Sequence, residues 1–94
     1  MAQNTTLSIT AQTWTLLTNS NVTALTFQNV GSNHILIAGT VGATPPSDYT
    51  GAIRYNPGQG ERNAALSDLF PGVSGANRVY AWADAATPVV VSHA

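Results

Sequence analysis

Short runs of β-branched and aromatic residues, separated by clusters of Gly, Pro and Asn about every ten residues, are the feature that most constrains the fold of this chain. Within the runs, apolar and polar side chains alternate, as they do in a strand with one buried face. Signals for helices of ordinary length are scarce. This rhythm predicts an all-β protein: a small antiparallel β-sandwich or barrel of about six to eight short strands.

Seven segments fit the strand pattern. They are residues 6–10, 13–18, 22–29, 34–40, 50–55, 78–84 and 87–92. The fourth is the most apolar, with Ile35 and Ile37 on one face and Leu36 on the other. Apolar residues on both faces predict a central strand, or a strand with one face against a neighbouring subunit.

The rest of the chain adds one helical segment and one polar end. Residues 63–70 contain Ala and Leu in a spacing that allows at most one short helical turn before Pro71 ends it. Residues 1–5 are polar and predict a flexible N-terminal arm. With no repeat and no linker, residues 1–94 are expected to form a single β domain.

Cysteine is absent from the 94 residues, which excludes disulfides and thiolate metal sites. The two histidines, His34 and His93, have no partner at a familiar metal-ligand spacing. We therefore expect no metal and no cofactor. Because burial and chain entropy nearly cancel in so small a domain, a partner surface is one source of added stability, and an efficient β core is the alternative.

Charged residues make up only 7% of the chain, against about 25% in an average soluble domain, and lysine is missing. The chain keeps Arg54, Arg62 and Arg78 together with two Trp and three Tyr. Arg, Trp and Tyr are enriched at protein interfaces, whereas Lys and Glu are depleted. The composition predicts a surface suited to being covered by other proteins, with an ordinary Thr-rich sandwich as an equally open alternative.

The net charge of -1 argues against nucleic acid and anionic membranes as partners, since phosphate contacts need clustered Lys and Arg. Residues 1–4 lack the basic and apolar stretches of a signal peptide, so synthesis in the cytoplasm is expected. The apolar run at residues 35–38 is too short to span a bilayer.

A nucleophilic triad could be drawn from Ser92, His93 and Asp84, or from His34 with Asp48. Nothing like a nucleophile elbow surrounds these residues. His93 is next to last in the chain, where fraying works against precise catalysis. His34 opens a predicted strand, and we expect it to cap or pack there.

The acidic residues lie in or near predicted turns and strand ends. They are Asp48, Glu61, Asp68 and Asp84. Solvation or pairing with arginine explains them better than the paired carboxylates of a glycosidase. Residues 58–60 form a turn and not a phosphate loop, because neither Lys nor a strong helix follows. We expect no catalytic residues and no enzymatic activity.

Trp14, Tyr80 and Trp82 fall on alternating strand faces, where core burial is the more common explanation. A sugar-stacking platform on the surface is the other reading. The exposure of Trp82 separates the two.

Three segments of the chain resemble the small virion proteins of tailed bacteriophages, in particular head decoration (cement) proteins and related small fibre or spike modules. They are the opening TWTLLTNSNVTALTFQNVGSNHILIAGT, the turn YNPGQG, and the ending NRVYAWADAATPVVVSHA, in which an aromatic strand, a tight turn and a Val-rich strand follow one another. Together they cover 52 of the 94 residues.

The resemblance implies a non-enzymatic structural protein that is made in the bacterial host cytoplasm and resides in the virion. Such a protein binds the major capsid protein on the outer capsid surface, commonly as a homotrimer near local threefold axes, and stabilises the shell. Residues 1–5 would then add a strand to a capsid sheet edge. The alternative is a receptor- or glycan-contacting module of a phage head or tail fibre.

Overall fold

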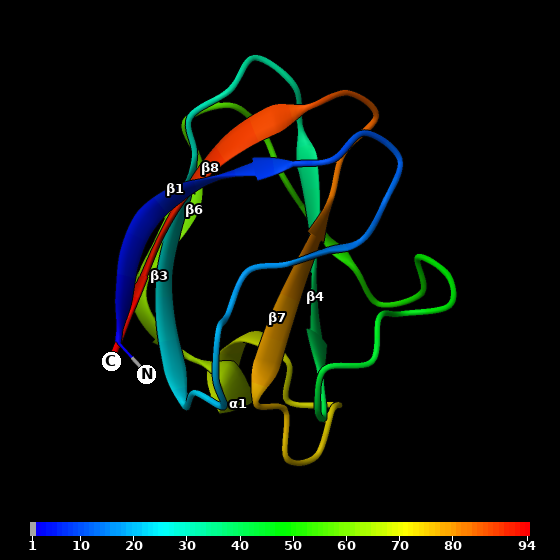
Figure 1. Ribbon diagram of the computed structural model, residues 1–94. Coiled ribbons are helices and arrows are strands. Elements are labelled where there is room, and N and C mark those ends of the chain that lie inside the picture. The colour runs from blue at the N-terminus through cyan, green and yellow to red at the C-terminus, as the bar shows by residue number, and fades with distance from the viewer. Residues whose placement is uncertain (1) are drawn as a thin grey trace.

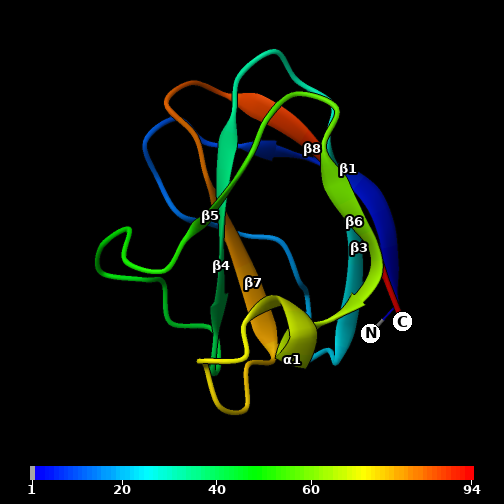
Figure 2. The same ribbon diagram turned by 180° about the vertical axis from the view of Figure 1, so that it is seen from behind.

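Two antiparallel four-stranded sheets pack face to face in the computed structural model, which describes residues 2–94 (Figures 1 and 2). The strand order in the first sheet is β1 (Gln3–Ile9), β8 (Thr87–His93), β3 (Ala24–Asn29) and β6 (Gly60–Ala65). The strand order in the second sheet is β2 (Thr15–Leu16), β7 (Arg78–Trp82), β4 (Ile35–Thr40) and β5 (Ile53–Tyr55). The predicted small all-β sandwich is confirmed.

The single short helix that the sequence predicts is α1 (Leu66–Leu69). The preceding residues form β6, a strand that sequence analysis missed because it has no alternating apolar residues. Pairing with β3 holds β6 in place, with a register shift between Leu25 and Phe27 and a positive φ of 47° at Asn63. The helix described within residues 2–94 is neither long nor apolar enough to cross a membrane.

The core lies between the two sheets. Along each strand, every second side chain points into it. The largest of its fully buried side chains are Ile9, Leu17, Leu25, Phe27, Ile35, Ile37, Leu66, Val79, Val89 and Val91. Across the core, the ring of Phe27 meets the ring of Tyr55 edge to face, with centroids 4.9 Å apart. This aromatic pair joins the first sheet to the second.

The chain ends lie in the first sheet. The C-terminal strand is paired on both sides, since β8 lies between β1 and β3. The prediction of a flexible arm over residues 1–5 is wrong for Gln3, Asn4 and Thr5, which belong to β1 and pair with β8; Met1 lies outside the described residues. Main-chain pairing with β8 orders this segment, and its polar side chains give no signal of that.

Asn29 is a fully buried polar residue at the end of β3. Its Nδ2 donates to the carbonyl oxygens of Asn33 at 2.7 Å and of Tyr55 at 3.2 Å. Its Oδ1 accepts from the Gly31 N–H at 3.0 Å. One side chain thus connects the turn after β3 with the end of β5 in the other sheet, and its hydrogen bonds offset the cost of its burial.

Candidate interaction surface

The second sheet turns its aromatic residues outward, away from the core. Val79 and Ala81 of β7 are fully buried between the sheets, so Tyr80 and Trp82 project from the opposite face. The alternation of residues predicts core burial for both aromatic residues. Tyr80 is indeed buried, being only 3% exposed. It is buried on the outer face of the sheet, however, and not between the two sheets.

Neighbouring strands surround these aromatic residues with apolar side chains. Leu36 of β4 pairs with Trp82, and Leu16 of β2 pairs with Tyr80. Both leucines point outward because the adjacent Ile35, Ile37 and Leu17 are buried in the core. The outer face of the second sheet is therefore apolar across three strands.

The loop from Val41 to Ala52 adds a further ring to this face. In Figures 1 and 2 the loop extends away from the two sheets between β4 and β5. The ring centroid of Tyr49 lies 5.1 Å from that of Trp82 and 6.1 Å from that of Trp14. Tyr49 is itself 55% exposed. We call Trp14, Leu16, Leu36, Tyr49, Tyr80 and Trp82 the aromatic face.

Polar and charged groups border the aromatic face. Arg54 of edge strand β5 pairs with Leu36 and is exposed. Beyond Trp82, the carboxylate of Asp84 lies 4.0 Å from His34 Nε2. An apolar centre rich in Trp and Tyr with a polar rim has the composition of a protein interface.

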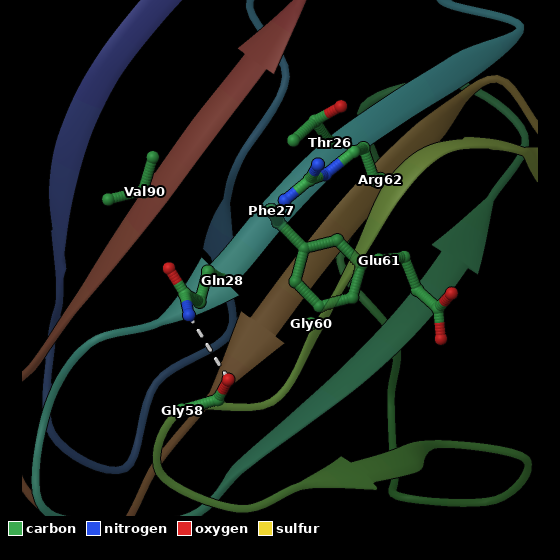
Figure 3. A pocket seen from close by; sticks show the side chains of 8 residues that line it. All are labelled: Thr26, Phe27, Gln28, Gly58, Gly60, Glu61, Arg62 and Val90. Carbon is green, nitrogen blue, oxygen red and sulfur yellow. Dashed lines mark hydrogen bonds between the residues drawn. The ribbon is translucent and has the colours of Figure 1, made fainter.

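A shallow cavity of about 290 Å³ lies on the first sheet between β3 and β6 (Figure 3). Its lining residues are Thr26, Phe27, Gln28, Gly58, Gly60, Glu61, Arg62 and Val90. Figure 3 shows Arg62 lying over β3, with Glu61 on the other side of its strand. Gln28 Nε2 donates to the Gly58 carbonyl at 3.1 Å.

The carboxylate of Glu61, which lines this cavity, is hydrogen-bonded to another side chain. The Tyr55 hydroxyl donates to Glu61 Oε2 at 3.1 Å. Burial, reinforced by this hydrogen bond and by the negative charge of Glu61, raises the pKa of Tyr55 to about 12. The charged groups that line the cavity are the Arg62 guanidinium and the Glu61 carboxylate, and Glu61 is engaged by Tyr55. The described lining residues therefore do not form an acid–base pair directed at a common point, and we regard the cavity as a surface groove.

The residues considered for a triad do not come together as the sequence allowed. His93 is buried, with Nε2 3.2 Å from Gln3 Oε1 and Nδ1 3.0 Å from the Ala94 oxygen. Asp84 lies against His34, whereas Asp48 accepts the main-chain N–H of Thr50 at 3.0 Å. Within residues 2–94 no three His, Cys, Asp or Glu side chains are grouped as metal ligands.

The aromatic face is what sequence analysis missed. Period-two alternation in residues 78–84 separates two apolar sets, one of small and one of large side chains. It does not say which set faces the core. The apolar residues on both faces of β4 were the available signal, because such a strand is expected to be central or to have one face against a neighbouring subunit.

No family model, curated protein or solved structure matches this chain.

Proposed function

We propose that this protein is a non-enzymatic structural component of a phage virion, which binds the outer surface of the capsid and stabilises the shell. The aromatic face is the observation that supports the proposal. It places Tyr49, which is 55% exposed, beside Trp82 on a sheet whose outer face is apolar. In a chain with only 7% charged residues, such a face is suited to being covered.

Repeated junctions between capsid subunits would favour a small binding protein of this kind. A capsid presents the same junction between subunits many times, and a protein that binds across a junction links the subunits on both sides. Each contact can be modest, because linked contacts on a multivalent surface raise the overall affinity strongly. The major capsid protein is therefore the proposed partner and the virion the proposed location. The resemblance also implies a homotrimer.

A second candidate function is contact with a glycan or receptor, as in a head or tail fibre. The exposed ring of Tyr49 next to Trp14 and Trp82 favours it, since aromatic rings stack on sugars. Against it, the Tyr49 ring meets Trp82 at 68° and Trp14 at 39°, so the three rings do not form one flat platform.

Co-sedimentation with undecorated capsids of the phage that encodes this chain tests the proposal. We expect saturable binding at a fixed ratio of protein to capsid subunits. Tyr49→Ser should weaken binding about tenfold or more, as for truncation of an interface anchor. Ser74→Ala is the matched control, because Ser74 is exposed and outside the aromatic face.

The outcomes separate the two functions. Absence of stoichiometric binding to capsids, with the fold intact by circular dichroism, would rule out the decoration role. Binding that Tyr49→Ser leaves unchanged would remove the aromatic face as the contact. Selective glycan binding on an array, lost in Tyr49→Ser, would establish the second function instead.

A further inference from the structure

The outer edge of β1 is open. Figures 1 and 2 both show β1 at the margin of the first sheet, with β8 on one side and none of the strands described for residues 2–94 on the other. The strand is seven residues long, contains neither charge nor proline, and pairs with β8 without a bulge. Proteins usually protect such an edge with charges, proline, bulges or short length, because unpaired main-chain groups recruit other strands.

The other three sheet edges have this protection. Strand β6 contains Glu61 and Arg62 and a register shift near Asn63. Strand β5 is three residues long and contains Arg54, and β2 is only two residues long. Among the described strands, β1 alone combines length, regular pairing and absence of charge at an edge.

One hydrogen bond identifies the groups on the open edge. The Val30 N–H donates to the Pro88 carbonyl at 3.2 Å, so the main-chain groups of Pro88 point toward β3. Main-chain groups of successive residues point to opposite neighbours, and those of Val89 therefore point toward β1. Leu7 is the partner of Val89 and faces β8. By the same alternation, Thr6 directs its N–H and C=O to the open edge.

Asn4 and Ser8 share the orientation of Thr6, and all three side chains are exposed on the outer face of the sheet. The open stretch ends at Thr10, whose N–H donates to Thr15 Oγ1 at 3.2 Å. The free edge is therefore centred on Thr6.

We propose that two copies of this chain pair antiparallel through β1, about a twofold axis at Thr6. Thr6 then lies opposite Thr6 of the partner subunit, and Asn4 lies opposite Ser8 of the partner subunit. Each of these pairs exchanges both main-chain hydrogen bonds, because all three residues direct their groups to the edge. The two first sheets become one continuous sheet.

A second copy fits this edge for three reasons. A register centred on Thr6 matches outer-face residues with outer-face residues, which a shift by one residue would prevent. It places a hydroxyl opposite a hydroxyl, and the amide of Asn4 opposite the hydroxyl of Ser8. Since β1 has no charge, self-pairing brings no like charges together.

The contact is isologous and uses the β1 edge of both copies, so it closes at two. It is thus different from the homotrimer that the resemblance implies, and it does not depend on capsid binding. Edge pairing covers less than the roughly 1,200 Å² of a standard interface. We expect a dissociation constant on the order of 0.1 mM.

Two proline variants test the edge assignment. Thr6→Pro removes an N–H that points to the open edge, where proline is tolerated, and should leave the fold stable while abolishing association. Thr5→Pro removes an N–H that points to β8 and should destabilise the fold. Equal destabilisation by the two variants would show that the edge has been assigned wrongly.

Charged variants test the register. Thr6→Lys places like charges opposite each other and should raise the dissociation constant at least about threefold. Asn4→Glu with Ser8→Lys in one chain places opposite charges together and should lower it, whereas Asn4→Glu with Ser8→Glu places like charges together and should raise it. Ser74→Lys is the control for charge alone.

The readouts are mass by analytical ultracentrifugation from about 10 μM to 1 mM, a range that brackets the expected constant, and hydrogen exchange of the Thr6 amide. We expect a monomer–dimer equilibrium and a Thr6 amide that becomes protected as concentration rises. A monomer throughout the range would overturn the proposal. So would a dimer or trimer in which the Thr6 amide stays unprotected or Thr6→Lys has no effect.

Discussion

The side chain of Asn29 is predicted to contribute more to stability than any exposed polar group of this protein. It is 0% exposed and makes three hydrogen bonds to main-chain groups of Gly31, Asn33 and Tyr55. Asn29→Leu keeps the number and branching of the side-chain heavy atoms but leaves one N–H and two carbonyl groups without their partner. The turn after β3 and the end of β5 then lose the side chain that connects them.

The magnitude follows from the groups left unpaired. Each buried polar group without a partner costs about 1–3 kcal/mol. Gly31 and Asn33 are only half-buried, so water can reach part of the site. We expect Asn29→Leu to lower the free energy of unfolding by about 3–5 kcal/mol, a large share of the 5–15 kcal/mol typical of a domain.

Asn29→Asp adds a pH dependence with a defined sign. The new carboxylate faces the carbonyl oxygens of Asn33 and Tyr55, so burial and repulsion raise its pKa in the folded state. The protonated acid can still donate one hydrogen bond. The loss of stability is therefore smallest below pH of about 3.9, the unfolded-state pKa, and grows as pH rises through the folded-state pKa.

Urea unfolding followed by tryptophan fluorescence, at several pH values, measures both effects. Asn56→Leu and Asn56→Asp are the controls, because Asn56 is exposed and its main chain alone makes the turn contacts. These controls should stay within about 0.5 kcal/mol of the wild type. An Asn29→Leu loss below about 1 kcal/mol, or an Asn29→Asp loss that does not change with pH, would refute the reasoning.

Three more predictions concern single side chains. A spectrophotometric titration should contain a tyrosine component near pH 12 that disappears in Tyr55→Phe; since the folded pKa lies above the unfolded value near 10, stability should fall as pH rises from 10 toward 12. Gly39→Ala should cost about 1–3 kcal/mol in urea unfolding, because the new Cβ would lie 2.5 Å from the Phe70 ring. Gly60→Ala should cost more, since its Cβ would overlap the main chain of β3, whereas Gly72→Ala, with open space around it, should change stability little.

The strands that sequence analysis located best are those with regular alternation and apolar cores. Segment 22–29 contains β3, and segment 87–92 covers β8 except for His93. Leu25 and Phe27 lie on the same face of β3 and are buried in the core. In these strands the local pattern and the final packing agree, because the buried face is the apolar face.

The elements that were missed owe their structure to pairing. Strand β6 contains Gly60, Glu61 and Arg62 at positions where an apolar residue would mark a strand, and only its contact with β3 makes it one. Likewise the polar start of β1 is ordered by β8. Pairing of segments far apart in sequence leaves no mark in a local pattern, so neither could be predicted from composition.

The aromatic face could be predicted in part. Sequence analysis identified the aromatic residues and the doubly apolar strand, but not their outward orientation. Between the sheets, the rings of Phe27 and Tyr55 meet edge to face, and β7 adds only the smaller Val79 and Ala81 to the core. In a close-packed core, the side-chain size that one strand can place there depends on the side chains of the others. The total side-chain volume of the core depends on all the strands. The sequence of one strand therefore does not show which of its faces is buried.

The positions of the few charged residues bear on both proposed contacts, the aromatic face and the open edge of β1. Four of the Asp, Glu, Lys and Arg residues lie in described strands: Glu61 and Arg62 on edge strand β6, Arg54 on edge strand β5, and Arg78 at the start of the central strand β7. Three of these four charges therefore lie on edge strands, where charge hinders strand addition. Strand β1 and the centre of the aromatic face carry none. Those are the two surfaces where we expect other chains to bind, one by main-chain pairing and the other by apolar contact.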